Sequence, residues 1–278
     1  MTTTLATGQK AQIKPARVPL SATSEKVIYG GGTVLGLLVV WEVLSRLGIL
    51  PSASFPPASE TLLRLFDLVF SASFWGAVGH TLQGTAIGLL IVCIVAVPLG
   101  LLIGRVHWID RSTLLIIEFL KPIPPVALLP LALLFYGPTL TMKSVLVFLG
   151  ALWPLLVQIT YAARALDPTQ TDMAKSYRLS FAKRVRYIFL PSLMPYALTG
   201  LRISISIGLV IAVVAELIGG ARGMGQEIAV AQNTADLPTM YSYIIATGVL
   251  GLIINGLFAL LSKPLLFWHA SQRKEGNS

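Results

Sequence analysis

The sequence predicts an all-α membrane protein with six transmembrane helices. Of its 278 residues, 55% are hydrophobic and 12% are charged, whereas about a quarter of the residues in soluble domains are charged. The mean hydropathy of +0.77 points the same way. Six apolar stretches are long enough for a helix to cross the hydrocarbon core, which takes about 20 residues. They are residues 27–45, 75–104, 112–136, 144–164, 195–218 and 241–267.

The segments around these spans are polar or amphipathic. Residues 1–26 lack an apolar core followed by a cleavage site, so we expect a disordered cytoplasmic tail rather than a signal peptide. A second tail is expected at 269–278, which leaves 27–268 as the transmembrane domain. Residues 57–70 carry apolar side chains at helical spacing and predict an interfacial helix. Residues 219–240 are too polar to span and predict a loop with a short helix.

Prolines mark several spans. Pro98, Pro130, Pro154 and Pro264 are candidate kink sites. The run 121–137 (KPIPPVALLPLALLFYG) is unusual, because prolines remove three backbone donors within four residues. A broken backbone at membrane depth is tolerated only inside protein or along a water-lined path. The run therefore predicts either a kinked packing helix or a translocation-path or gate element, whose residues would be Glu118, Lys121, Pro122, Pro124 and Pro125.

Lysines and arginines near the span ends set the orientation. They gather in the amino-terminal tail, in the connections after the second and fourth spans, and at the carboxyl end. If these regions are cytoplasmic, only Arg46, Arg64, Lys143 and Arg222 lie outside. We therefore expect both termini in the cytoplasm, and the net charge of +9 reflects topology rather than nucleic-acid binding.

Residues for catalysis, cofactor binding or metal binding are not expected in this chain. Its one cysteine, Cys93, lies in an apolar run, and the three histidines are scattered. A G-x-x-x-x-G-K-[ST] phosphate loop is missing, so any ATP hydrolysis must come from another protein. The glycine-rich GGARGMG at 219–225 follows an apolar span rather than a strand, and it predicts a tight re-entry turn instead of a phosphate cradle.

Charged residues inside the spans are costly and need an explanation. Glu118 and Lys121 are spaced to pair on one helix face. Glu42 and Arg202 lie near span ends, where snorkelling or capping accounts for them. For Glu216, a structural contact with the loop that follows is favoured over contact with a substrate.

Small residues recur at four-residue spacing and allow close helix approach, either within the subunit or across a dimer. The pairs are Gly84/Gly88, Gly100/Gly104 and Ser204/Gly208.

The polar stretch 167–202 separates two apolar spans. Asp167 can cap a short helix that tolerates Pro168 in its first turn and carries Met173 and Tyr177 on one face. After a break at 179–180, apolar residues return at helical spacing with basic residues opposite. Two amphipathic pieces at the cytoplasmic side predict a docking surface.

This stretch resembles the EAA signature of permease subunits from binding-protein-dependent ABC importers. Asp172 takes the acidic position, Arg178 takes the glycine position, and Pro191 ends the I-x-L-P element. Further resemblance to the nitrate/sulfonate/taurine-type permeases runs from Trp41 to Trp268. It is carried by WEVLSRLGILP at 41–51, by the run 121–137, by LPSLMPYALTGLRISISIGLVIAVVAEL and by the GMG loop.

The resemblance implies a type I ABC importer permease fold, with a cytoplasmic coupling helix between helices 4 and 5 at about 167–191. It implies a bacterial inner-membrane protein that works as a homodimer, surrounded by membrane lipid. Two ATP-binding subunits would bind ATP and Mg, and an external solute-binding protein would deliver a small anionic solute such as a sulfonate, taurine or nitrate. The residues assigned to coupling are Asp172, Met173, Ala174, Ser176, Tyr177, Arg178, Leu179, Ser180 and Phe181, and those assigned to structure are Leu190, Pro191, Arg202 and Glu216.

Three departures from the signature stand out. Asp172 is one methylene shorter than the usual glutamate, Met173 replaces a small residue, and Arg178 replaces glycine, which predicts a break shifted toward Ser180. Two alternatives remain open at this point. One is an autonomous secondary transporter or channel, and the other is a membrane scaffold that binds acidic partners through 183–186.

Overall fold

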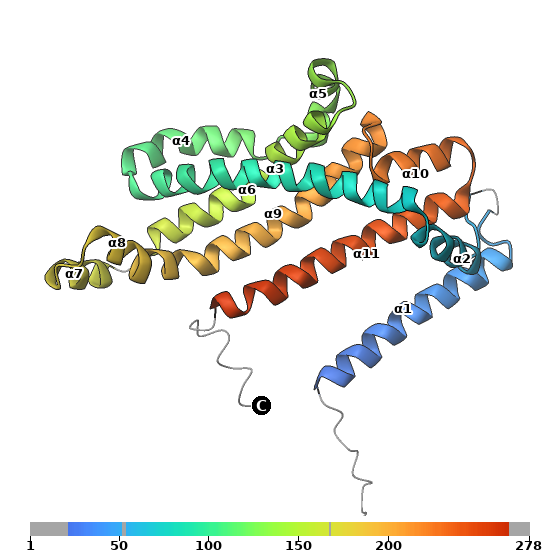
Figure 1. The fold of residues 1–278 in the computed structure, drawn as a ribbon, viewed down its shortest axis with the longest axis horizontal. Coiled ribbons are helices and arrows are strands. Elements are labelled where there is room, and N and C mark those ends of the chain that lie inside the picture. Colours follow the sequence, from blue (N-terminus) through green and yellow to red (C-terminus); the bar gives the residue numbers. More distant parts are fainter. Residues whose placement is uncertain (1–21, 52–53, 167, 267–278) are drawn as a thin grey trace, which may run out of the picture. The chain divides into compact units, whose positions relative to one another are not determined.

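The computed structural model describes residues 22–51, 54–166 and 168–266, and every regular element in these ranges is a helix (Figure 1). The all-α class is therefore confirmed for the described residues. The chain divides into two compact units, 1–58 and 59–278. Helix α1 begins at Ala22, within the predicted tail 1–26. The remainder of that tail and the tail 269–278 lie outside the described residues.

The first unit is built on α1 (Ala22–Arg46), which contains the first predicted span, 27–45. In its last turn the Arg46 Nε lies 2.5 Å from Glu42 Oε1, so the charge of Glu42 is paired at the helix end. The Ser45 hydroxyl donates to the Phe55 carbonyl (3.0 Å) and ties down the chain that follows. The described part of α1 is not among the stretches long and apolar enough to cross a membrane, so this span stays a prediction.

The second unit holds the remaining helices, starting with α2 at the unit boundary. They are α2 (Ala58–Val69), α3 (Ala72–Arg105), α4 (His107–Leu120), η1 (Pro125–Leu128), α5 (Leu129–Tyr136), α6 (Leu140–Arg164), α7 (Pro168–Ser176), α8 (Phe181–Arg184), η2 (Val185–Phe189), α9 (Leu190–Gly219), α10 (Met224–Asn233), α11 (Leu237–Ser262) and η3 (Pro264–Leu266).

Four helical stretches among the described residues are long and apolar enough to cross a bilayer, and a bent pair would make a fifth. They are α3, α6, the stretch from Phe181 to Asn233 that contains α9, and α11. These helices coincide with the predicted spans 75–104, 144–164, 195–218 and 241–267. A multi-pass membrane protein is therefore supported, whereas the full set of six spans is not.

The predicted third span, 112–136, is not one helix. The Lys121 N–H closes α4 by donating to the Ile117 carbonyl (2.9 Å), and the chain resumes helical structure only at Pro125. The two pieces meet at 77°, because the prolines in KPIPP can neither donate to a preceding turn nor allow their neighbours to stay helical. By contrast, Pro98 and Pro154 lie inside the unbroken helices α3 and α6.

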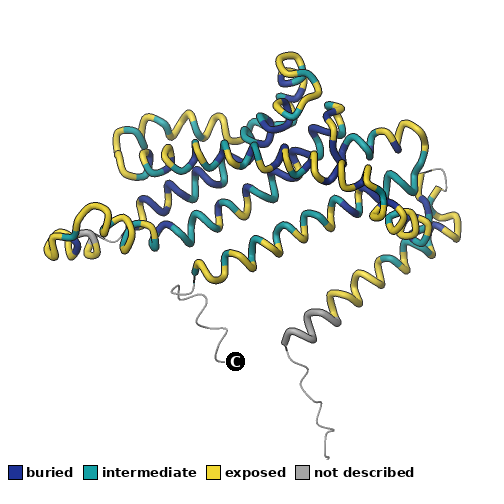
Figure 2. Tube along the Cα trace, viewed as in Figure 1, coloured by how far each residue is buried: buried dark blue, intermediate teal, exposed yellow. Residues whose placement is uncertain are grey.

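The core of this unit is formed where α6 packs against α3 on one side and α9 on the other (Figure 2). A Cβ added at Gly88 would lie 2.5 Å from Val147 Cγ1, and one added at Gly104 would lie 2.7 Å from the Thr160 carbonyl oxygen. On the other side the Ser204 hydroxyl donates to the Ala151 carbonyl (2.7 Å). The spaced small residues therefore serve close packing within the subunit.

Short polar side chains fix where three of the spans begin. Ser71 Oγ accepts from the Phe74 N–H (3.2 Å) at the start of α3, and Thr139 Oγ1 accepts from the Met142 N–H (3.4 Å) at the start of α6. Asp236 Oδ1 accepts from the Thr239 N–H (3.2 Å) at the start of α11. Each cap satisfies a donor that the first turn of a helix leaves free.

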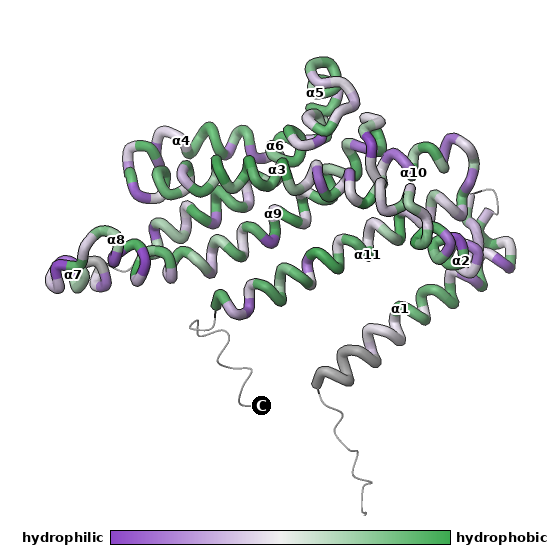
Figure 3. The backbone as a smooth tube through the Cα atoms, in the orientation of Figure 1, coloured by the Kyte–Doolittle hydropathy of each residue, from purple (hydrophilic) through white to green (hydrophobic). Residues whose placement is uncertain are grey.

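Hydrophobic residues make up most of the length of the spans (Figure 3), and many of them are exposed. On α3 and α11, Leu90, Ile94 and Leu252 are each more than 60% exposed. Such a surface is unfavourable in water and suits the hydrocarbon interior of a bilayer.

The α3–α6 contact predicts that replacing glycine with alanine changes the stability of the protein differently at two positions of α3. Gly88→Ala should destabilise the protein by about 1–3 kcal/mol, because the new methyl group meets a stiff β-branched side chain and the Ser144 carbonyl oxygen at 2.9 Å. Gly76→Ala, also on α3, faces open space and should leave stability equal or slightly higher. Unfolding of detergent-solubilised protein measures both. Equal stabilities for the two variants would contradict the packing described here.

Candidate functional site

The largest fully buried side chain in the described residues is that of Lys143, in the first turn of α6. It is 1% exposed, and its Nζ donates to Glu216 Oε1 (2.6 Å), the His80 carbonyl (2.6 Å) and the Arg222 carbonyl (2.7 Å). An ammonium group has three donors, so every one of them is used. The charge at this end of α6 is therefore internal to the protein.

Glu216, near the end of α9, is 0% exposed and receives the other half of this network. Its Oε2 accepts from the Thr81 hydroxyl (2.8 Å) and from the Gly225 N–H (3.1 Å). Thr81 in turn accepts from the Met224 N–H (2.9 Å). The pair therefore connects four elements, α3, α6, α9 and the start of α10.

The glycines of GGARGMG make room for this carboxylate. Gly220 ends α9 in the left-handed conformation (φ 72°), and Gly223 has a φ of 155°. A Cβ on Gly223 would lie 2.1 Å from the Glu216 carboxyl carbon, and one on Gly225 would lie 2.1 Å from the Val213 carbonyl oxygen. The run forms a tight turn between α9 and α10, and its Gly225 N–H is used by the protein's own carboxylate.

Sequence reasoning missed the pairing of Lys143. It placed this lysine outside the membrane as an ordinary charge flanking a span, whereas the structure buries it completely. The available signal was Glu216, because a carboxylate in an apolar run needs a nearby cation or several donors.

The segment between α6 and α9 contains the two short helices expected there, α7 and α8. Asp172 and Lys175 form an exposed ion pair on α7 (2.9 Å), which contributes little to stability. Ser176 uses its hydroxyl within the same helix, donating to the Asp172 carbonyl (3.0 Å). Asp167, the expected cap of α7, lies outside the described residues.

The break after α7 lies at Arg178. This residue has a φ of 49°, its N–H donates to the Lys175 carbonyl (2.9 Å), and the Leu179 N–H donates to the Ala174 carbonyl (2.9 Å). The two bonds make a Schellman motif with arginine at the position that usually holds glycine. The predicted shift of the break toward Ser180 is therefore wrong, because Ser180 has a φ of −59°.

The faces of α7 differ. Met173 and Tyr177 are 54% and 74% exposed, whereas Ala174 between them is 2% exposed. Of the remaining coupling candidates, Ser180 and Phe181 are exposed and Leu179 is half-buried. Ala174 therefore packs inside the protein and does not belong to the surface that a partner could contact.

The residues assigned to a path or gate lie around the break between α4 and α5. Glu118, Lys121, Pro122 and Pro124 are exposed, and Pro125 is half-buried against Gly150. Neither Glu118 nor Lys121 takes part in an ion pair with any described residue, so the expected pairing of the two is wrong.

A cavity of about 140 Å³ lies beside this break, between α4 and α6. Its polar side chains are those of Asp110, Thr113, Glu118, Lys121, Thr160, Tyr161 and Arg164. Asp110 and Arg164 form an ion pair across it, from α4 to α6. The lining carries both signs of charge.

The residues assigned to structure fall on α9. Leu190 and Pro191 open the helix, where proline is tolerated because the first turn leaves its N–H free. Arg202 is exposed, and its carbonyl accepts from the Ser206 hydroxyl (3.2 Å). Within the described ranges, no group of three histidine, cysteine, aspartate or glutamate side chains could hold a metal ion.

Comparison with known proteins gives a family match. Residues 96–265 match the family described as "Binding-protein-dependent transport system inner membrane component". The chain is 26% identical to the putative aliphatic sulfonates transport permease protein SsuC of Bacillus subtilis, covering 84% of this chain and 85% of that protein. It is 26% identical to the taurine transport system permease protein TauC of Escherichia coli (88% and 91% covered) and 28% identical to the nitrate import permease protein NrtB of Synechocystis (90% and 94% covered).

Among solved structures, the chain is similar to one of the MetNI methionine ABC transporter in an inward-facing conformation. The TM-score is 0.60 at 16% identity, covering 69% of this chain and 95% of that chain. At this identity the likeness concerns the fold.

The Lys143–Glu216 pair predicts strong coupling in a double-mutant cycle. Lys143→Met should cost about 3–5 kcal/mol, because it leaves a buried carboxylate without its cation. Glu216→Gln should also destabilise, and the double variant should be less unstable than the sum of the single losses by about 1–3 kcal/mol. Chemical unfolding in mixed micelles measures all three. Additive losses would show that the two side chains do not act as a pair.

The left-handed Arg178 predicts a gain from glycine. Arg178→Gly should stabilise the turn after α7 by about 1 kcal/mol, because glycine removes the Cβ that disfavours this conformation. Arg178→Ala removes the same charge but keeps the Cβ, so it serves as the matched control. Hydrogen exchange of the Leu179 amide in the Schellman motif should slow in the glycine variant alone. The same exchange rate in both variants would contradict the strained geometry.

Proposed function

Because this chain belongs to the family of binding-protein-dependent transport system inner membrane components, we propose that it is the permease subunit of an ATP-driven ABC importer. In this proposal the chain forms the translocation path and does not itself hydrolyse ATP. Two copies of a separate ATP-binding subunit bind ATP and Mg, and a second permease copy completes a homodimer. Both termini face the cytoplasm, and an external solute-binding protein delivers the solute.

The observation that carries this proposal is the outward face of α7. Met173 and Tyr177 are large, largely apolar and exposed, on a helix of the polar 167–202 stretch rather than on a span. Methionine and tyrosine are enriched in protein interfaces, where burying them supplies much of the binding energy. A separate subunit that covers these two side chains would be physically linked to the start of α9.

The connection between α7 and α9 is suited to transmitting a movement of α7 to the membrane span α9. The Schellman motif at Arg178 ends the helix sharply, and α8 with η2 leads directly into α9. Displacement of α7 by a partner would therefore be passed through α8 and η2 to the membrane span α9. We assign α7 and the turn that follows as the coupling element, with Ala174 as an internal packing residue.

The bent pair α4–α5 supports the path assignment. At the break, carbonyl groups lose their helical partners, and such groups at membrane depth need protein or water around them. The charged residues Glu118 and Lys121 lie beside the break and line the cavity between α4 and α6. A water-accessible path along this break would satisfy both.

The names of several relatives support a substrate class. Four that match most of the chain are named as permeases for aliphatic sulfonates (putative), taurine, nitrate and bicarbonate, which favours a small anionic or zwitterionic solute. An autonomous transporter gains no support from a specific feature. The described residues contain one bent helix pair, whereas such transporters usually carry a matching pair in each half.

The proposal predicts that the α7 face binds the ATP-binding subunit. Met173→Ala combined with Tyr177→Ala should weaken association with that subunit by at least about tenfold, because two exposed anchor side chains are lost. Tyr187→Ala is the matched control, since Tyr187 is 66% exposed but lies beyond α8. Co-purification of the epitope-tagged permease with its ATP-binding subunit, followed by solute-stimulated ATPase activity in liposomes, measures both steps. Unchanged association of the double variant would remove α7 as the docking helix.

A further inference from the structure

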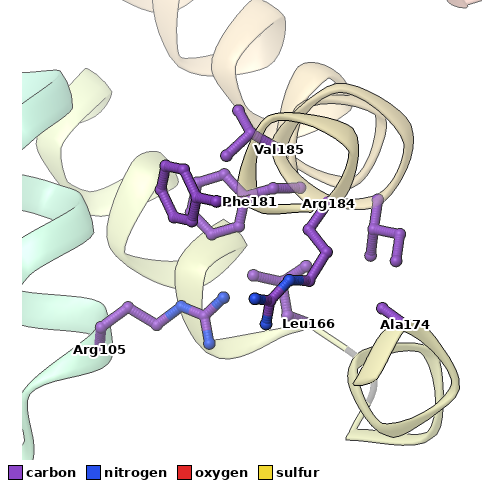
Figure 4. A pocket seen from close by; sticks show the side chains of 8 residues that line it. Arg105, Leu166, Ala174, Phe181, Arg184 and Val185 are labelled. Carbon is purple, nitrogen blue, oxygen red and sulfur yellow. The ribbon is translucent and has the colours of Figure 1, made fainter. Parts of the chain in front are cut away.

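A cavity of about 220 Å³ lies between the end of α3, the buried side of α7, and the α8–η2 segment (Figure 4). We call it the arginine cavity. Its lining is mostly apolar, with two cationic side chains. The lining residues are Arg105, Leu166, Ala174, Phe181, Arg184, Val185, Ile188 and Phe189.

Both guanidinium groups point into this cavity from opposite walls (Figure 4). The Arg105 guanidinium carbon lies 5.1 Å from the centre of the Phe189 ring, and this cation–π contact holds the group in place. The Arg184 Nε is buried and makes no hydrogen bond. Neither arginine forms an ion pair with any residue that the structure describes.

An arrangement of this kind favours an anionic occupant. A buried donor without a partner costs about 1–3 kcal/mol, and two unneutralised cations facing one space repel each other. An oxyanion between them would accept from both guanidinium groups, which are well shaped for phosphate and carboxylate. The apolar walls formed by Phe181, Val185 and Ile188 would suit an occupant that also has a hydrocarbon part.

The position of the cavity in the fold indicates which kind of anion it binds. Arg105 is the last residue of the span α3, and Phe189 immediately precedes α9, so the cavity lies where two membrane helices end. Phospholipid headgroups occupy this depth, and basic pockets between spans on the cytoplasmic side bind anionic headgroups. Lys183 and Arg186 on the same segment add positive charge nearby.

We propose that the arginine cavity binds the phosphate of an anionic phospholipid from the cytoplasmic leaflet. The cytoplasmic placement rests on the proposed function. Ala174 lines the cavity, whereas the exposed Met173 and Tyr177 do not. The lipid and the ATP-binding subunit therefore contact α7 on different faces. The lipid ties α7 to the ends of α3 and α9, and the coupling segment depends on the composition of the membrane.

The test uses the full-length permease alone in detergent, with phosphatidylglycerol and phosphatidylcholine as probes. Native mass spectrometry measures the fraction of protein that keeps each lipid. The wild type should retain phosphatidylglycerol in preference to phosphatidylcholine. Arg105→Gln combined with Arg184→Gln should lower phosphatidylglycerol retention by about tenfold or more, because both oxyanion donors are lost. The double lysine variant at the same positions, which keeps the charge, should recover part of the retention.

The matched control is Lys183→Gln combined with Arg186→Gln, which removes the same number of charges, from the α8–η2 segment that also carries Arg184, but outside the cavity. It should lose much less phosphatidylglycerol than the cavity variant, because neither side chain lines the cavity. Equal losses in the two double variants would mean nonspecific surface attraction, and unchanged binding in both would mean that the cavity holds no lipid. Either outcome overturns the proposal.

Two further readouts keep this test separate from the proposed function. Thermal unfolding shows whether each variant is folded. If the glutamine variant does not fold, the lysine variant still tests whether the cavity binds lipid. Co-purification with the ATP-binding subunit is measured in parallel. If the glutamine variant keeps phosphatidylglycerol but loses that subunit, the cavity receives an acidic side chain of the partner and the lipid proposal is wrong. Lost lipid with intact association supports the proposal.

Discussion

The buried contact between Lys143 and Glu216 is the constraint on which the second unit depends. Removing two charges from solvent is costly, and the structure offsets this cost with hydrogen bonds from a hydroxyl and a backbone amide and to two backbone carbonyls. These partners lie on α3, on α10 and in the turn that precedes α10. The pair therefore holds one end of α3, α6, α9 and α10 together, and the turn GGARGMG exists in this form because its glycines leave space for the carboxylate.

Away from this ion pair, the helices are held together by close contact between their backbones rather than by charge. Hydrocarbon tails are as apolar as leucine, so lipid gives helices little hydrophobic reason to associate. The glycines of α3 bring its backbone close to α6, where van der Waals contacts are dense. Prolines have the opposite effect on α4 and α5, because they end helical bonding and turn the chain by 77°. Glycines therefore allow α3 and α6 to pack closely, whereas prolines bend the chain between α4 and α5.

Sequence reasoning succeeded where the signal is local. Spans such as 144–164 follow from continuous apolar composition. The resemblance placed Arg178 at the position that usually holds glycine, but the expected shift of the break toward Ser180 is wrong, because Arg178 itself takes the left-handed conformation. Sequence reasoning failed where the signal is distant. Local periodicity does not predict that Lys143 pairs with a residue 73 positions later. It also does not predict that Ala174 is buried while its neighbour Met173 is exposed. The proline run predicts a break in the helix. The angle between α4 and α5 depends on the residues against which each helix packs.

The sequence separation of the buried pair has a consequence for biogenesis. Lys143 lies in α6, and its partner arrives 73 residues later in α9, so α6 is made before Glu216 exists. Until then the ammonium group has no carboxylate and must stay at the lipid–water boundary, which the first turn of α6 allows. Insertion of the first spans therefore leaves an unfinished structure. The helices lock together only when α9 is delivered, which makes late chain synthesis the step that commits the protein to its fold.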